Sequence, residues 1–200
     1  MRVDTAISEA IVPVTLTTGN SNFVMRRKKP IPPDRIIEKG LYLIDQEQYE
    51  SAFHLFNMYL EQVEDDPVAY YGRGVALAGM EDYENALRDL DCALELDPDD
   101  DFSLNERAQV KAALGFYEAA LADMDKAIEL APEEPSLYYN RGIIHNDFAN
   151  LQAAINDYSM AIKLDVNFAN AWYNRGIAFW DLGAGDAAIA DFTRAIQLDP

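Results

Sequence analysis

A pattern that recurs every 34 residues is the strongest constraint on how this chain folds. Four copies carry, in step, an aromatic residue or leucine, an arginine, a small residue and an alanine, and a weaker fifth copy starts near Pro33. The four sets are Tyr70, Arg73, Gly74 and Ala86; Leu104, Arg107, Ala108 and Ala120; Tyr138, Arg141, Gly142 and Ala154; and Trp172, Arg175, Gly176 and Ala188. A fixed period of this length predicts a stack of equivalent units.

Inside each copy, apolar residues recur at intervals of three and four, which predicts two amphipathic helices. In the second copy Gly74 and Leu77 share one face of the first helix, and Glu81 and Asp82 mark the turn to the second. Two helices joined by so short a turn lie close together, so small residues such as Gly74 and Ala86 are expected where they cross. The chain is therefore predicted to be all-α.

Prolines mark several of the repeat boundaries. Pro98, Pro132 and Pro200 each follow a predicted second helix, where a proline ends one helix without interrupting the next. Glu64 and Val166 hold the equivalent positions in the first and fourth copies, so these two junctions are expected to be less sharply defined. The predicted repeats are 33–66, 67–100, 101–134, 135–168 and 169–200, preceded by a basic, proline-containing arm, 1–32, that is flexible or partly extended.

The net charge of -19 is unevenly distributed along the chain. Residues 1–32 carry five lysines and arginines against Asp4 and Glu9, which leaves 11 basic and 33 acidic residues for the repeats. Such an acidic body repels phosphate backbones and anionic membranes, so nucleic acid and membranes are not expected partners, whereas a basic or apolar protein or peptide is. The N-terminus lacks the pattern of a signal peptide and no stretch is long and apolar enough to span a bilayer, which predicts a cytoplasmic protein. The single cysteine, Cys92, excludes a disulfide within the chain.

A 34-residue helix-turn-helix unit with an aromatic residue, a small residue four positions later, an Ala-x-x-x-aromatic segment and a closing proline resembles the tetratricopeptide repeat (TPR). The resemblance covers residues 33–200 and implies a right-handed α-solenoid of antiparallel helix pairs, with the first helices lining its concave face. It also implies the usual function of the family, which is to hold a peptide or helix of a partner protein in that groove.

The chain departs from the family pattern in having arginine where the family has leucine before the small residue. Sixteen residues after each arginine there is an aspartate, and the first copy, with Lys39 and Leu55, lacks both partners. We predict that each arginine pairs with its aspartate in bidentate geometry. The alternative is that the arginines bind an acidic ligand, but the in-phase aspartates favour a structural ion-pair ladder. The predicted pairs are Arg73 with Asp89, Arg107 with Asp123, Arg141 with Asp157, and Arg175 with Asp191.

The resemblance also indicates which side chains face the groove, namely those at six positions of each first helix. They supply aromatic rings, aliphatic groups, amides that can bond to an extended peptide backbone, and an acidic margin. The predicted peptide-binding residues are Tyr71, Asn105, Gln109, Tyr139, Asn140, Ile143, Asp147, Tyr173, Asn174, Ile177 and Asp181. Chaperone-binding members share a clamp of Lys, Arg and Asn for a C-terminal carboxylate, which is not reproduced here: Ile37, Leu41 and Gly72 occupy clamp positions.

No arrangement typical of an enzyme, a metal site or a cofactor site occurs in the sequence. His54 and His145 lie in different repeats, and His145 is expected to be a core residue with its hydrogen bonds satisfied. The acidic run from Asp97 to Asp101 lacks the pattern of a calcium loop and is expected to be a solvated turn that caps the next helix.

The favoured hypothesis is a protein-interaction scaffold that binds a peptide in its concave groove. The alternative is a self-assembling or fragmentary solenoid, since the apolar side of the last helix pair, around Ala187, Ile189 and Ile196, has no following helix in this sequence to cover it. A third hypothesis is that the basic arm docks on the acidic body until a partner displaces it.

Overall fold

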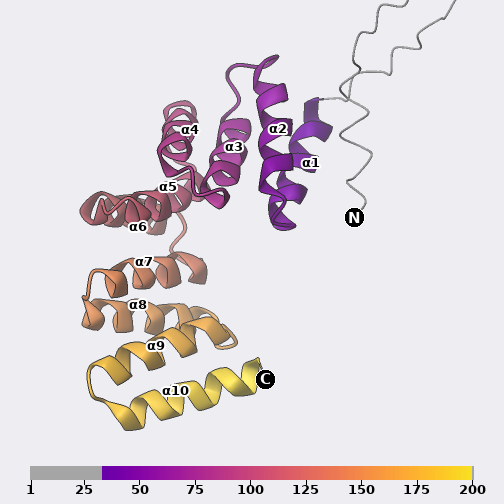
Figure 1. Ribbon diagram of the computed structural model, residues 1–200. Coiled ribbons are helices and arrows are strands. Elements are labelled where there is room, and N and C mark those ends of the chain that lie inside the picture. Colours follow the sequence, from indigo (N-terminus) through magenta and orange to yellow (C-terminus); the bar gives the residue numbers. More distant parts are fainter. Residues whose placement is uncertain (1–32, 200) are drawn as a thin grey trace, which may run out of the picture.

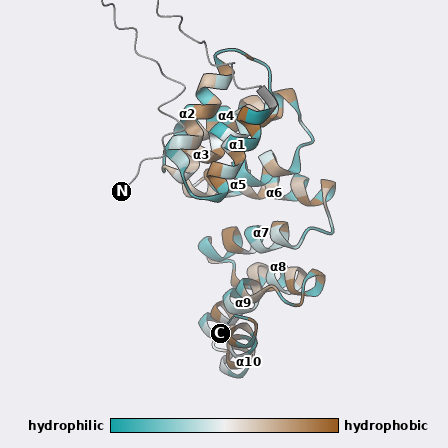
Figure 2. Ribbon diagram, turned by 90° about the vertical axis from the view of Figure 1, so that its right-hand side faces the viewer, coloured by the Kyte–Doolittle hydropathy of each residue, from teal (hydrophilic) through white to brown (hydrophobic). Residues whose placement is uncertain are grey.

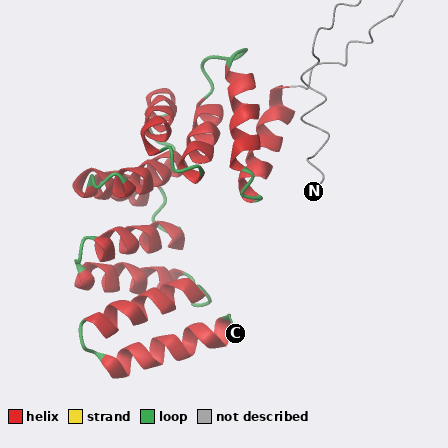
Figure 3. Cartoon of the chain, viewed as in Figure 1, coloured by secondary structure: helices red, strands yellow, loops and turns green. Residues whose placement is uncertain are grey.

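The computed structural model describes residues 33–199 and contains ten α-helices in that range, with no strand (Figures 1 and 3). The predicted arm, 1–32, lies outside the described residues. The helices are α1 (Pro33–Asp45), α2 (Tyr49–Leu60), α3 (Pro67–Gly79), α4 (Tyr83–Leu96), α5 (Asp101–Ala113), α6 (Tyr117–Leu130), α7 (Pro135–Asp147), α8 (Leu151–Leu164), α9 (Ala169–Asp181) and α10 (Gly185–Leu198).

The odd-numbered helices begin at residues 33, 67, 101, 135 and 169, so their spacing equals the 34-residue period of the sequence. Each is 13 residues long and packs against the even-numbered helix that follows it as an antiparallel pair. Figure 2 shows hydrophobic and hydrophilic residues interspersed along the helices, as expected for amphipathic elements. The predicted α-solenoid of helix pairs is confirmed.

Close approach of the two helices within a repeat explains the small residue in the middle of the first one. A Cβ atom added to Gly74 would lie 2.9 Å from the Leu90 side chain and 3.4 Å from the Ala86 carbonyl oxygen. At Gly142 the same atom would lie 2.6 Å from the Tyr158 ring. Since real Cβ atoms do not approach other atoms to less than 3.0 Å, a larger residue at either glycine would push the helices apart. The prediction for Gly74 and Ala86 is confirmed.

The turn inside each repeat has one residue in the left-handed region, again at intervals of 34 residues. These residues are Glu47, Glu81, Gly115, Ala149 and Gly183, with φ values between 56° and 81°. Glycine adopts this conformation without steric penalty, whereas the other three positions hold a strained side-chain-bearing residue. The turn geometry is therefore set by the repeat, even where the residue does not favour it.

Neighbouring repeats share their cores, which holds the stack together. The cluster around Phe56, for example, joins Ile36 and Leu43 of α1 to Ala69 and Ala76 of α3. Within residues 33–199 the odd-numbered helices of adjacent repeats contact one another, whereas the even-numbered ones do not. The odd-numbered helices consequently lie on the inner, concave side of the curved stack. In Figure 1 the helices of the first two repeats run up the page and those of the last two run across it, so the stack twists along its length.

The junctions between repeats correct one sequence prediction. Asp165, before Val166, ends α8 with φ -133° and ψ 101°, close to the φ -132° and ψ 90° of Asp97 before Pro98. The expected looseness at Val166 is therefore wrong, because the backbone adopts the same extended geometry without proline. The first junction does differ: α2 ends at Leu60, two residues earlier in the repeat than α4 does.

A buried tyrosine organises that first junction. Tyr59 donates a hydrogen bond of 2.6 Å to Asp66 Oδ2, while Asp66 Oδ1 accepts from the backbone N–H groups of Val68 and Ala69 and so caps α3. This hydrogen bond, together with burial and the negative charge of Asp66, raises the pKa of Tyr59 to about 12. One carboxylate thus joins the end of the first repeat to the start of the second.

Candidate functional site

The four predicted arginine–aspartate pairs are all present. In each, Nε and Nη2 of the arginine donate to the two carboxylate oxygens of the aspartate sixteen residues later, at 2.7 to 2.9 Å. The aspartates are buried, with 4% to 7% of their surface exposed. This bidentate arrangement suits a guanidinium and connects the two helices of one repeat. The pairs occupy the arginines internally, which favours the structural interpretation over binding of an acidic ligand.

The third hydrogen bond of every arginine was not predicted from the sequence. Nη1 donates to a side chain sixteen residues earlier, on the even-numbered helix of the preceding repeat, at 2.6 to 3.0 Å. Each arginine therefore bridges two repeats as well as two helices. The signal was available in the sequence, where a side chain that can accept a hydrogen bond recurs every 34 residues. The acceptors are Asn57, Asp91, Asp125 and Ser159.

The third and fourth repeats differ in a second side chain beside the aspartate. In the third repeat, Lys111 Nζ lies 2.7 Å from Asp123 Oδ2. At the equivalent position of the fourth repeat, His145 Nε2 lies 3.8 Å from Asp157 Oδ2, and its buried Nδ1 has no hydrogen-bond partner among the described residues. The prediction of a core histidine with its hydrogen bonds satisfied is wrong on this point, because Nδ1 has no partner and Nε2 is too far from the carboxylate for a hydrogen bond.

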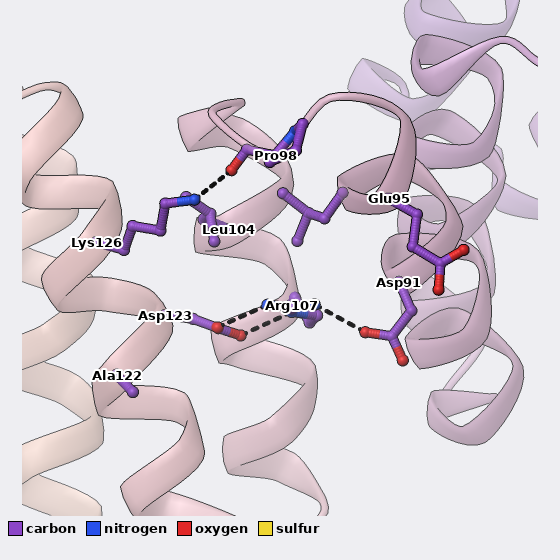
Figure 4. Close-up of a pocket in the computed structure, with 9 residues that line it drawn as sticks. Asp91, Glu95, Pro98, Leu104, Arg107, Ala122, Asp123 and Lys126 are labelled. Atoms are coloured by element: carbon purple, nitrogen blue, oxygen red, sulfur yellow. Dashed lines mark hydrogen bonds and ion pairs between the residues drawn. The ribbon is translucent and has the colours of Figure 1, made fainter.

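A cavity of about 270 Å³ opens beside this ladder between α4, α5 and α6 (Figure 4). Arg107 projects across it and bonds to Asp123 on one side and Asp91 on the other. Lys126, at its rim, lies 3.1 Å from Asp99 and donates to the Pro98 carbonyl. Because the basic groups of the cavity are already paired within the protein, it offers an incoming acidic ligand no free cation.

The acidic run between α4 and α5 caps the next helix as predicted. The Asp100 carboxylate accepts a hydrogen bond of 2.9 Å from the backbone N–H of Ser103, in the first turn of α5. Among the described residues, no group of His, Cys, Asp and Glu side chains is arranged to hold a metal ion. In the same range, no helix is long and apolar enough to cross a membrane.

The residues predicted to line the groove are distributed over four inner helices. Tyr71 lies on α3; Asn105 and Gln109 on α5; Tyr139, Asn140, Ile143 and Asp147 on α7; and Tyr173, Asn174, Ile177 and Asp181 on α9. Two pairs of them bond across neighbouring repeats. Asn140 Nδ2 donates to Asn105 Oδ1 at 2.9 Å, and Asn174 Nδ2 donates to the Tyr139 hydroxyl at 3.0 Å. These amides therefore use part of their bonding capacity to join the inner helices and retain the rest.

Aromatic rings on the last two inner helices differ in how freely they face solvent. Tyr139 is held by two ring neighbours, Phe168 at 4.8 Å and Tyr158 at 5.9 Å between centroids. Tyr173 is 53% exposed and Trp180 is 63% exposed. The exposed pair gives α9 a large aromatic surface, although the Tyr173 ring also packs against Phe192, with 5.6 Å between the ring centroids. Asp147 and Asp181, also exposed, lie at the ends of α7 and α9.

Gly72 shows why the clamp described for chaperone-binding relatives cannot form here. It is buried, and a side chain at this position would overlap the ring of Phe56. Phe56 also fills the space beside Gly40 on α1. An asparagine at position 72 is therefore sterically incompatible with this core, in agreement with its absence from the sequence.

Repeated helix pairs, a shared core and an inner face of amides and aromatic rings define a helical-repeat protein of the solenoid type. Models described as tetratricopeptide repeat match residues 67–100, 105–165 and 169–200, and one described as TPR repeat matches residues 150–183. The chain belongs to the tetratricopeptide repeat family.

Comparison with known proteins supports the fold. No curated protein matches the chain in sequence. Among solved structures, TTC0263, a thermophilic TPR protein from Thermus thermophilus, has a TM-score of 0.75 and 19% identity over 84% of this chain and 92% of that chain. MamA from Desulfovibrio magneticus RS-1 has a TM-score of 0.71 and 21% identity over 84% and 94%. YrrB, described as a TPR protein with an unusual peptide-binding site, has a TM-score of 0.63 and 22% identity over 82% and 85%.

Proposed function

We propose that this protein is a non-enzymatic interaction scaffold that holds a peptide or helix of a partner protein against its concave face. The observation that carries the proposal is the exposed aromatic pair Tyr173 and Trp180 on α9, together with the partly satisfied amides of Asn174 on the same helix and Asn140 on α7. Exposed aromatic rings flanked by hydrogen-bonding groups are typical of protein interaction sites. The peptide-binding site named in the description of the YrrB structure is consistent with this use of the fold.

The charge of the chain indicates the chemistry of the partner. With 33 acidic and 11 basic residues in 33–200, the body attracts basic segments and repels nucleic acids and anionic membranes. Six of those basic residues are engaged in ion pairs with aspartates. The free carboxylates Asp147 and Asp181 at the margin of the groove add to this preference. We therefore expect a basic or apolar peptide as the ligand.

Affinity capture followed by mass spectrometry tests the proposal. The protein with Tyr173→Ser and Trp180→Ser should lose partners that the wild type retains, because these two exposed rings make no hydrogen bond that folding requires. Leu96→Ser with Leu130→Ser is the matched control, since both leucines are also exposed but end even-numbered helices. Equal capture by the wild type and the aromatic variant would contradict binding at this part of the concave face.

We also infer a second candidate function, self-association through α10. Ile189 and Ile196 are 60% and 65% exposed, whereas the equivalent residues of α8, Ile155 and Ile162, are 6% and 7% exposed. In the internal repeats this surface packs against the next helix pair, so on α10 it suits a second copy of the chain or a further repeat. Light scattering tests self-association: Ile189→Glu with Ile196→Glu should convert an oligomer to a monomer, and a wild type that is monomeric at high concentration would exclude it.

A further inference from the structure

A second cavity lies on the concave side of the first three repeats. Its volume is about 310 Å³, at the lower end of the range for pockets that bind ligands. The walls are mostly apolar or aromatic and come from α1 to α5. They consist of Ile44, Tyr49, Val75, Ala78, Gly79, Tyr83, Glu106, Gln109, Val110 and Ala113. Neither the groove prediction nor the family resemblance singled out Glu106 or the two tyrosines.

Among the residues that the structure describes, Glu106 is the only charged side chain that lines this cavity, and no lysine or arginine there forms an ion pair with it. Within the described part of the chain, its hydrogen bond is from Gln109 Nε2 at 3.3 Å, and burial raises the pKa of its carboxyl group. The cavity beside Arg107 is different, because there each basic group meets an aspartate of the protein. A partly buried carboxylate among apolar groups gains most from a cation supplied by a ligand.

Helix ends of both kinds surround Glu106. The C-terminal turns of α1, α3 and α5, represented by Ile44, Gly79 and Ala113, carry partial negative charge, whereas the first residues of α2 and α4, Tyr49 and Tyr83, mark helix N-termini with partial positive charge. Tyr71, on α3, has its pKa raised first by burial and then by four carboxylates, from Glu106, Asp100, Asp45 and Asp101. The negative charge of the cavity itself therefore comes from the Glu106 carboxylate, because Tyr71 and the three aspartates do not line it.

We propose that this cavity binds a lysine or arginine side chain of the partner peptide, with its aliphatic stem against Val75 and Val110 and its cationic group at Glu106. The rings of Tyr49 and Tyr83 line the same space and suit both the stem and the cation. This assignment rests on the proposed function, because it specifies one residue of the peptide that the concave face holds. It predicts a partner with a basic residue at a fixed place in its binding segment.

Selection from a random dodecapeptide library displayed on phage, with the immobilised full chain as the target, provides the probe. Selected peptides should share a lysine or arginine, and Kd is then measured by fluorescence anisotropy for a labelled peptide and for its analogue with norleucine in place of that residue. We expect norleucine to weaken binding to the wild type at least tenfold, which is about 1.4 kcal/mol at 25 °C. Glu106→Gln should weaken the basic peptide equally and change binding of the norleucine analogue less than twofold.

Glu129→Gln is the matched control, because Glu129 is exposed on α6 and its replacement changes the net charge by the same amount. It should leave both affinities unchanged. Equal affinity for the two peptides in the wild type, or a preference for the basic peptide that survives Glu106→Gln, would overturn the assignment. If the selected peptides instead lose binding only in the Tyr173→Ser and Trp180→Ser variant, the proposed function stands and this pocket is excluded. A library that yields no binder contradicts both.

The chain carries its own basic segment, Arg26 to Lys29, whose charge is of the same kind as that of the proposed peptide residue. Replacing these four residues by glutamine in the full chain separates the two sources. Unchanged peptide affinity supports a partner as the occupant. Tighter binding would show that the segment competes for the pocket and would overturn the assignment to a partner peptide.

Discussion

Removing an arginine from the ladder should affect the third and fourth repeats to different extents. Arg141→Met leaves Asp157, which is 6% exposed, without a lysine or arginine partner among the described residues, and His145 Nε2 lies 3.8 Å away. Arg107→Met leaves Asp123, which is 7% exposed, but Lys111 remains 2.7 Å away. Breaking a buried ion pair on one side destabilises a protein by about 3–5 kcal/mol, because the remaining charge is left without compensation.

We therefore expect Arg141→Met to lower the free energy of unfolding by about 3 kcal/mol. The decrease caused by Arg107→Met should be smaller by about 1–2 kcal/mol, because Lys111 keeps one charge-assisted hydrogen bond to Asp123. Arg141 also lies over the Tyr138 ring, 5.8 Å from its centroid, and this contact adds to the difference in the same direction. The double variant with Arg107→Met and Lys111→Met separates the two causes, since it should lose most of the protection that Lys111 provides.

Urea unfolding followed by circular dichroism at 222 nm measures these differences. Midpoints and slopes are compared together, because a repeat protein can unfold in more than one step and the slope reveals such a change. Arg88→Met serves as the control, since Arg88 is exposed and should change stability by no more than about 0.5 kcal/mol. The reasoning is refuted if Arg141→Met is no more destabilising than Arg88→Met, or if Arg107→Met and Arg141→Met are equally destabilising.

Four further substitutions test other features. Tyr59→Phe should lower the free energy of unfolding by about 1–2 kcal/mol at pH 7. Because the pKa of Tyr59 in the folded state is raised from 10.0 to about 12, this loss should be complete below pH 10 and disappear as the pH rises through about 12. A difference in urea unfolding that does not change with pH would contradict the hydrogen bond to Asp66. Ala149→Gly should raise the thermal midpoint, with a gain of roughly 0.5 kcal/mol, because alanine is strained at φ 58°, and Gly183→Ala should lower it. The Glu106→Gln variant should be more stable than the wild type at pH 7 and equally stable below the ordinary pKa of glutamate. The reason is that burial raises the pKa of Glu106 in the folded wild type and so makes its ionised form unfavourable. A difference in thermal midpoint between the two proteins that does not change with pH would exclude this burial effect.

The arginine ladder shows how far a repeated sequence can be interpreted without coordinates. A pair that recurs in four copies behaves like several independent observations of one contact, so Arg107 and Asp123 could be assigned to each other from spacing alone. The prediction that a small residue is needed at Gly74 was confirmed for the same reason, because the two helices that cross there belong to one unit. Local spacing predicts these contacts because both partners belong to the same 34-residue unit.

Contacts between units were predicted less well. The bonds from Asn140 to Asn105 and from Asn174 to Tyr139 join residues 35 positions apart, and their formation depends on how one repeat is rotated against the next. The unsatisfied Nδ1 of His145 likewise reflects a small difference in side-chain reach that the repeat pattern does not contain. Which predicted groove residues bind a peptide stays a prediction.

The number of helices per repeat, their spacing, the small residues at their crossings and the arginine–aspartate pairs could all be predicted from the sequence, because each of these depends on distances along one helical hairpin. Three other features required the folded stack: the third hydrogen bond of each arginine crosses to the preceding repeat, Phe56 fills the space beside Gly72, and Glu106 lies in a mostly apolar cavity between the ends of several helices. These features depend on the twist between repeats, and that twist results from side-chain packing across the whole stack.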